Sequence, residues 1–196
     1  TKGTVFCVKH SYPKLLQNNI DPYACVILDP RSIEGTSTHG VVRKDLFSLI
    51  DHKTKFLIAS MTDISVTKYL MDKTDEIYGW HAYSEAVAAA AKGKSFAVDK
   101  KLNIAKDTTF VTGGTCSAMR AIGMSHILGF RNFHLFGFDC SIPKVTAKMK
   151  KEKTEDGKPK YLHVETNGKE FWTTGELLAM GQDCEKLFSN QDIEMN

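Results

Sequence analysis

Residues 111–142 read VTGGTCSAMRAIGMSHILGFRNFHLFGFDCSI, and this stretch decides the fold. Its pattern predicts a turn of small residues, a helix over 115–128 that Gly129 ends, and a strand over 132–137. Asp139 comes just after that strand. A helix between strands at this spacing is typical of an α/β sheet, in which ligands bind at the carboxyl ends of the strands.

The turn before this helix has the residue types that an anion-binding loop needs. Gly113 and Gly114 allow a sharp backbone turn, and Thr115 or Ser117 is expected to cap the helix. The N–H groups of a helix start attract phosphate, so these four residues and Cys116 are candidate phosphate contacts. The alternative is an ordinary strand-to-helix turn. No Lys-Ser or Lys-Thr pair follows, so the turn is not a P-loop.

Asp139 is the candidate catalytic and metal-binding carboxylate. At the end of a core strand it could bind Mg²⁺ or accept a proton from a substrate hydroxyl. The alternative is a carboxylate that caps a nearby backbone turn.

Two further candidates follow other predicted strands. Asp29 and Arg31 come after the strand over 24–28, where they could grip a hydroxyl and a phosphate. They could equally form a local ion pair that steadies the turn at Pro30. His10 follows the strand over 4–8 and is a candidate general base, although a surface or structural role is the alternative.

Strands and helices alternate along the first two thirds of the chain. The remaining strands are predicted over 55–59 and 76–79, the latter followed by a loop at Trp80-His81, while 95–98 is left undecided. The remaining helices are predicted over 11–18, 42–50, 64–71 and 84–91. This order predicts an α/β fold, a Rossmann-like three-layer α/β/α arrangement with a mainly parallel sheet.

The character of the sequence changes after Ile142. Residues 144–160 hold seven lysines and are expected to form a mobile, solvated excursion, or a lid over a polyphosphate. A β-hairpin is predicted over 161–165 and 170–172 around Asn167-Gly168, and a last helix runs from a cap at Thr173 or Thr174 to about Phe188. We predict a single domain with a core over 1–143 and the hairpin and closing helix over 161–190.

Composition restricts the partners. With 196 residues, 42% of them hydrophobic, and a net charge of +3, the chain has the composition of a globular domain rather than a nucleic-acid binder. No apolar run is long enough to span a membrane, and no leader is visible. Five cysteines without CxxC spacing indicate a reducing cytoplasm and neither a disulfide framework nor a zinc site. Small-molecule partners are expected, with a homo-oligomer possible.

Three phrases in this order resemble one family. They are LLQNNIDPYACVILDPR over 15–31, the Gly-Gly-Thr helix start through Gly-Phe-Asp over 113–139, and the glycine hairpin with its last helix over 168–187. In these phrases the chain resembles the 6-hydroxymethylpterin diphosphokinase MptE-like family over nearly its whole length.

The resemblance implies a nucleotide-dependent transferase on a Rossmann-like fold. Archaeal members of that family move a diphosphate from ATP to a pterin-type alcohol with Mg²⁺. Related bacterial proteins look like glycosyltransferases that modify flagellin, and the sheet resembles that of sialyltransferases using CMP-sugars. By this resemblance Gly113, Gly114 and Thr115 would face phosphate, and Asp29 and Asp139 would be the strand-end carboxylates.

This chain departs from the family in two places. Family members usually begin with a strand that leads into a Gly-x-Gly-Pro-Ser-Leu loop, and this sequence begins after that point, so it is either a fragment or a variant that lost half of the site. Cys116 and Met119 replace the small or aliphatic residues that are commoner there. A degenerate nucleotide-binding domain without catalysis is therefore the alternative to an enzyme.

Overall fold

A computed structural model describes residues 3–34, 41–83, 110–114, 116–189 and 194–195. The chain divides into two compact units, Thr1–Phe130 and Arg131–Asn196, and each is described by itself. Of the elements expected from the sequence, the helix over 84–91 and the undecided segment 95–98 lie outside the described residues. None of the helices in the described part has both the length and the apolar content that a bilayer crossing requires.

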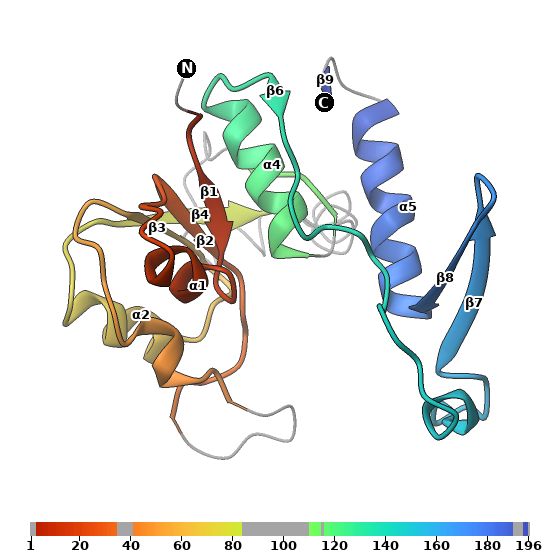
Figure 1. Cartoon of the computed structure of the whole chain (residues 1–196). Coiled ribbons are helices and arrows are strands. Elements are labelled where there is room, and N and C mark those ends of the chain that lie inside the picture. Colours follow the sequence, from red (N-terminus) through yellow and green to blue (C-terminus); the bar gives the residue numbers. More distant parts are fainter. Residues whose placement is uncertain (1–2, 35–40, 84–109, 115, 190–193, 196) are drawn as a thin grey trace, which may run out of the picture. The chain divides into compact units, whose positions relative to one another are not determined.

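The first unit is built on a five-stranded parallel sheet in the order β1-β2-β3-β4-β5. Strands β1 to β4 are labelled in Figure 1. The strands are β1 (Phe6–Val8), β2 (Ala24–Ile27), β3 (Lys55–Ala59), β4 (Ile77–Ala82) and β5 (Phe110–Val111). The register pairs Cys7 with Cys25 and Cys25 with Phe56, so the carboxyl ends of the strands share one edge. All four residues of β2 are buried, as expected for a central parallel strand covered on both faces.

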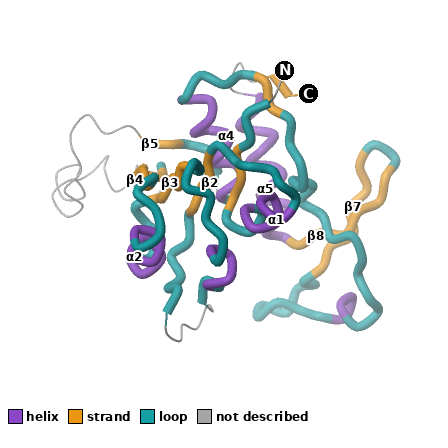
Figure 2. The backbone as a smooth tube through the Cα atoms, turned by 60° about the vertical axis from the view of Figure 1, so that its left-hand side comes forward, coloured by secondary structure: helices purple, strands orange, loops and turns teal. Residues whose placement is uncertain are grey.

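Alternate residues of each strand enter two separate cores. One core joins Cys25, Ile27 and Phe56 to side chains of α1 (Tyr12–Gln17), the 3-10 helix η1 (Lys44–Phe47) and α2 (Ile64–Met71). The other joins Val26, Leu57 and Trp80 to side chains of α4 (Ser117–Ile127). In Figure 2, α4 lies above the row of strands and α2 below it. The predicted Rossmann-like α/β fold with helices on both faces is confirmed.

Two local predictions in this unit are wrong. The expected loop at Trp80-His81 is part of β4, because Trp80 is buried and its indole N–H donates to the Leu57 carbonyl at 3.0 Å. The helix expected over 42–50 is only the single 3-10 turn of η1, since Leu46 and Phe47 already bury its apolar side. A short apolar segment cannot by itself distinguish these outcomes.

Helix α4 ends as the sequence predicts. Gly129 adopts φ +97°, and its N–H donates to the His126 carbonyl at 3.0 Å. The Phe130 N–H donates to the Ser125 carbonyl at 3.0 Å, which completes a Schellman motif.

One strand of the second unit is shorter than the sequence predicts. Strand β6 covers only Asn132–Phe133 and pairs with β9 (Glu194–Met195) rather than running over 132–137. Its partner is only two residues long, so the ladder stops there, and Phe136 is 91% exposed. Apolar composition predicted a core strand, but a strand also requires a neighbour over its whole length.

The hairpin and last helix of this unit are confirmed. Strands β7 (Tyr161–Thr166) and β8 (Lys169–Thr174) pair antiparallel around Asn167 and Gly168, whose φ angles are +51° and +69°. Positive φ at both positions is what a type I′ hairpin turn needs. Helix α5 (Gly175–Ser189) follows, and the Leu177 N–H donates to the Thr174 hydroxyl at 3.2 Å, so Thr174 is the cap.

The lysine-rich segment contains regular turns. It holds the 3-10 turn η2 (Met149–Lys151) and an isolated bridge between Lys153 and Pro159. An ion pair of 3.0 Å between Lys160 and Glu152 closes its end. Its lysines are mostly exposed, as predicted for a solvated excursion.

Candidate functional site

A buried ion cluster lies at the carboxyl edge of the sheet. Asp29 follows β2 and is 4% exposed, and Lys9 follows β1 and is 7% exposed. The Lys9 ammonium pairs with Asp29 Oδ2. Arg31 binds the same carboxylate in a bidentate manner, with Nε at 2.8 Å from Oδ1 and Nη2 at 2.7 Å from Oδ2. Because parallel strands end at one edge, three residues from two strand ends meet here.

The pKa of Asp29 is held well below the usual carboxyl range. Burial alone would raise this pKa, but hydrogen bonds from Arg31 and Lys9 to the ionised form outweigh the burial. The carboxylate is therefore charged at neutral pH, and the two cations leave the cluster with a net charge of +1.

The backbone of Asp29 is fixed by the end of the neighbouring strand β3. Its N–H donates to the Thr62 hydroxyl at 3.5 Å, and its carbonyl accepts from the Asp63 N–H at 3.1 Å. Asp63 in turn caps α2 by accepting from the Ser65 N–H at 2.9 Å. The carboxylate thus stands on a rigid support rather than on a loose loop.

The first turn of α4 lies beside the end of β2. Cys116 is the N-cap residue and makes no side-chain capping bond. Ser117, expected as a cap, is instead the first helical residue, and its hydroxyl donates to the Leu28 carbonyl at 3.4 Å. Thr115 lies outside the described residues. The start of α4 is therefore adjacent to the backbone that leads into Asp29.

Gly113 and Gly114 make this approach possible. They adopt φ angles of +127° and +69°. A Cβ atom on Gly113 would lie 2.5 Å from the Met119 carbonyl oxygen, closer than any side chain permits. The predicted sharp turn is confirmed, and its direct contact with phosphate remains a prediction.

Arg120 is a buried cation that the sequence pattern did not indicate as a site residue. It lies in α4, is 7% exposed, and donates to the Val111 carbonyl and, at 2.6 Å, to the Tyr83 carbonyl. Its guanidinium thereby joins the ends of β4 and β5 to α4. An arginine at a position where the helical pattern expects an apolar residue was the available signal.

His10 lies beside the ion cluster and also lines a hollow. Burial lowers its pKa, and the nearby charges of Lys9 and Arg31 lower it further, so the ring is neutral at pH 7. The hollow has a volume of about 370 Å³ and lies between α1 and η1. Its lining comprises His10, Pro13, Lys14, Gln17, Arg43, Asp45 and Leu46.

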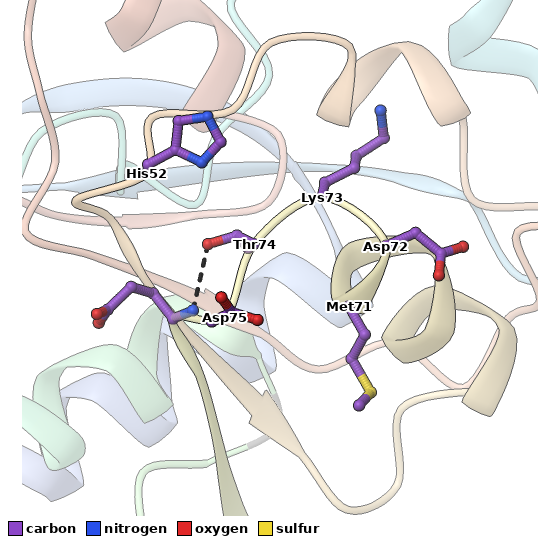
Figure 3. A pocket seen from close by; sticks show the side chains of 7 residues that line it. His52, Met71, Asp72, Lys73, Thr74 and Asp75 are labelled. Carbon is purple, nitrogen blue, oxygen red and sulfur yellow. Dashed lines mark hydrogen bonds between the residues drawn. The ribbon is translucent and has the colours of Figure 1, made fainter.

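A second hollow, of about 440 Å³, opens at the opposite edge of the sheet (Figure 3). It is formed by His52 and by residues 71–76, which precede β3 and β4. The Glu76 N–H donates to the Thr74 hydroxyl at 3.2 Å across this turn. Although larger, this hollow lies at the amino ends of the strands, where α/β sheets do not usually bind their ligands.

Asp139 belongs to the second unit and is exposed. One oxygen accepts from the Ser141 N–H at 3.3 Å, which is the turn-capping contact that its sequence context also allowed. Because β6 ends at Phe133, Asp139 does not follow a core strand directly, and the premise for its catalytic role is corrected. The role itself remains a prediction.

The described carboxylates do not fit Mg²⁺ well. Mg²⁺ requires oxygen ligands that are free to coordinate it, whereas both oxygens of Asp29 bind cationic side chains. Asp139 offers a single carboxylate. In the described ranges, no group of three His, Cys, Asp or Glu side chains lies close enough together to hold a metal ion.

No protein-family model matches this chain, and neither a curated protein nor a solved structure matches it. The resemblance to the MptE-like family, and the transferase activity that it implies, therefore remain predictions.

Proposed function

We propose that the chain is a nucleotide-dependent transferase that holds donor phosphate at the carboxyl edge of its first unit. The observation that carries the proposal is the buried Lys9–Asp29–Arg31 cluster. Its net positive charge lies beside the start of α4, whose N-cap residue Cys116 makes no side-chain capping bond. Cationic side chains and helix N–H groups are the two devices with which proteins bind phosphate.

Arg31 is the member of the cluster that can reach a ligand. Its side chain is 37% exposed, whereas Lys9 is 9% and Asp29 6% exposed by the same side-chain measure. Asp29 fixes one side of the Arg31 guanidinium, so that the guanidinium is already oriented before a ligand binds. Preorganisation of this kind strengthens phosphate binding because less rotamer freedom is lost.

His10 is the proposed general base. As the acceptor oxygen forms its bond to the transferred phosphorus or sugar carbon, the bond from that atom to the leaving phosphate oxygen breaks. The electron pair stays on the leaving oxygen, which Arg31 and the N–H groups of α4 stabilise. The hydroxyl proton passes to the neutral His10 ring, whose lowered pKa keeps it able to accept one.

The donor is either ATP, for a diphosphate transfer, or a CMP-sugar. The diphosphate transfer to a pterin-type alcohol follows the resemblance. The CMP-sugar is favoured by one observation, which is that the described edge offers cations rather than a set of carboxylates for Mg²⁺. Titrating the chain with ATP–Mg²⁺ and with CMP-sialic acid, followed by ³¹P NMR, separates the two donors. Binding without turnover would identify a non-catalytic nucleotide-binding domain.

Replacing Arg31 by glutamine is expected to weaken binding of the preferred donor by about 10-fold, because one charge-assisted contact to phosphate is lost. Isothermal titration calorimetry measures the affinity. Lys53→Gln removes an exposed charge away from this edge and should leave the affinity unchanged. Equal affinities in the Arg31→Gln variant and the wild type would exclude Arg31 from the site.

We also place the proposed activity in the cytoplasm. Cys7 and Cys25 face each other across β1 and β2 as buried free thiols, which is the usual state of cysteine in a reducing compartment.

A further inference from the structure

We infer that the hollow between α1 and η1 binds a small organic anion that carries a free hydroxyl, and that this anion is the acceptor of the transfer. The role of this anion as the acceptor rests on the proposed function, whereas its binding rests on the hollow itself. Its volume of about 370 Å³ lies within the range of small-molecule sites.

The charges around the hollow favour an anion. Lys14 and Arg43 are cationic, and Asp45 is the one carboxylate among the lining residues. Both Asp45 oxygens already accept from Arg43, through Nε at 2.9 Å and through Nη2. The lining therefore retains a net charge of +1, and its carboxylate is not available to a cationic ligand.

The walls of the hollow match a short organic body. Leu46 is 6% exposed and, with Pro13, provides apolar contact on two sides. The Gln17 amide can donate to an anionic group or accept from a hydroxyl. A ligand with a short carbon chain, an anionic end and a hydroxyl uses all of these surfaces.

His10 relates the hollow to the Lys9–Asp29–Arg31 ion cluster. His10 lines the hollow, and it is the sequence neighbour of Lys9, whose ammonium binds Asp29. The charges of Arg31 in the cluster and of Arg43 in the hollow both lower the pKa of its ring. A hydroxyl in the hollow would therefore lie next to the proposed base and on the same edge as the donor phosphate.

The test is an NMR titration of the whole chain with ¹⁵N-labelled histidine rings. The probes are glycerate, glycerol 3-phosphate and, as a neutral control, glycerol. Both anions are expected to shift the His10 signals in a saturable manner, whereas glycerol should not. The tighter of the two anions identifies a carboxylate or a phosphate as the preferred group.

Lys14→Gln and Arg43→Gln should each weaken binding of the tighter anion about 3- to 10-fold. Lys73→Gln changes the same kind of charge in the hollow at the other edge and should have no effect. The inference would be overturned if neither anion gave a saturable His10 shift. It would also be overturned if both the Lys14→Gln and the Arg43→Gln variant bound the anion as tightly as the wild type.

Parallel titrations with the nucleotides separate this inference from the proposed function. Nucleotide binding without anion binding overturns the hollow as a site and leaves the transferase. Anion binding without nucleotide binding supports the hollow as an anion site and overturns its role as an acceptor site.

Discussion

Replacing Asp29 by alanine is expected to lower the free energy of unfolding by about 3 kcal/mol. The substitution leaves the Lys9 ammonium, 7% exposed, without the carboxylate that compensates its charge. Arg31 loses both partners of its bidentate contact at the same time. Breaking a buried pair by removing one partner costs more than the pair contributes, since the remaining charge stays desolvated. Urea unfolding followed by circular dichroism measures the change.

Two further variants isolate this cause. Adding Lys9→Met to Asp29→Ala removes the uncompensated charge and should recover a substantial part of the lost stability. Asp45→Ala breaks an Asp–Arg pair with the same spacing, but both partners are exposed, so little change is expected. A loss in the double variant as large as in Asp29→Ala would show that the carboxylate acts through something other than Lys9.

The same ion cluster predicts a particular pH dependence. Because the folded pKa of Asp29 is depressed, the unfolded chain binds its proton more readily, and stability rises with pH in that range. The contribution is fully present above the unfolded carboxyl pKa of about 4. It is lost as pH falls from there toward the folded value. The stability difference between the wild type and Asp29→Asn should therefore shrink below about pH 4. A difference that stays constant from pH 7 to pH 3 would contradict this assignment.

The sequence predicts the central strands β2 and β3 well because they are buried on both faces, whereas it does not predict the two-residue strand β5. Continuous apolar runs such as 24–28 and 55–59 have few alternatives to a central parallel strand. The segment 132–137 also carries apolar residues, Phe133, Leu135 and Phe136, yet only Asn132–Phe133 forms a strand. Strand length depends on the pairing partner, and the partner of Asn132 is Glu194, 62 positions later in the chain, which no local pattern reveals.

The candidate site is predicted in part for a similar reason. Asp29 and Arg31 are two residues apart in sequence, so their pairing is local, and the alternative of an ion pair at Pro30 anticipates it. Lys9 reaches the same carboxylate from another strand, and only the strand order brings it there. The contacts of Arg120 also depend on the strand order, because its partners are carbonyls at two strand ends. The prediction for Asp139 depends on a strand over 132–137, and the observed strand β6 ends at Phe133.

Replacing Gly123 by alanine is expected to lower the free energy of unfolding by about 2 kcal/mol. Gly123 lies within α4, where alanine normally stabilises a helix by about 1 kcal/mol. Here a Cβ atom would lie 2.6 Å from the Thr112 carbonyl oxygen, so the helix and the turn must separate. The clash with backbone outweighs the gain in helix propensity, and thermal unfolding followed by circular dichroism measures the net result.

Gly181→Ala in α5 is the matched control. Its Cβ would meet Cys140 only at ordinary contact distance, 3.8 Å, so the helix propensity gain should prevail and raise stability by about 0.5–1 kcal/mol. If Gly123→Ala lowers the free energy of unfolding and Gly181→Ala raises it, then α4 packs closely against the turn at 112–114 because Gly123 has no side chain. That turn and the start of α4 form the proposed phosphate site, so Gly123→Ala should also weaken nucleotide binding. A variant that is more stable than the wild type would show that α4 does not approach the turn this closely.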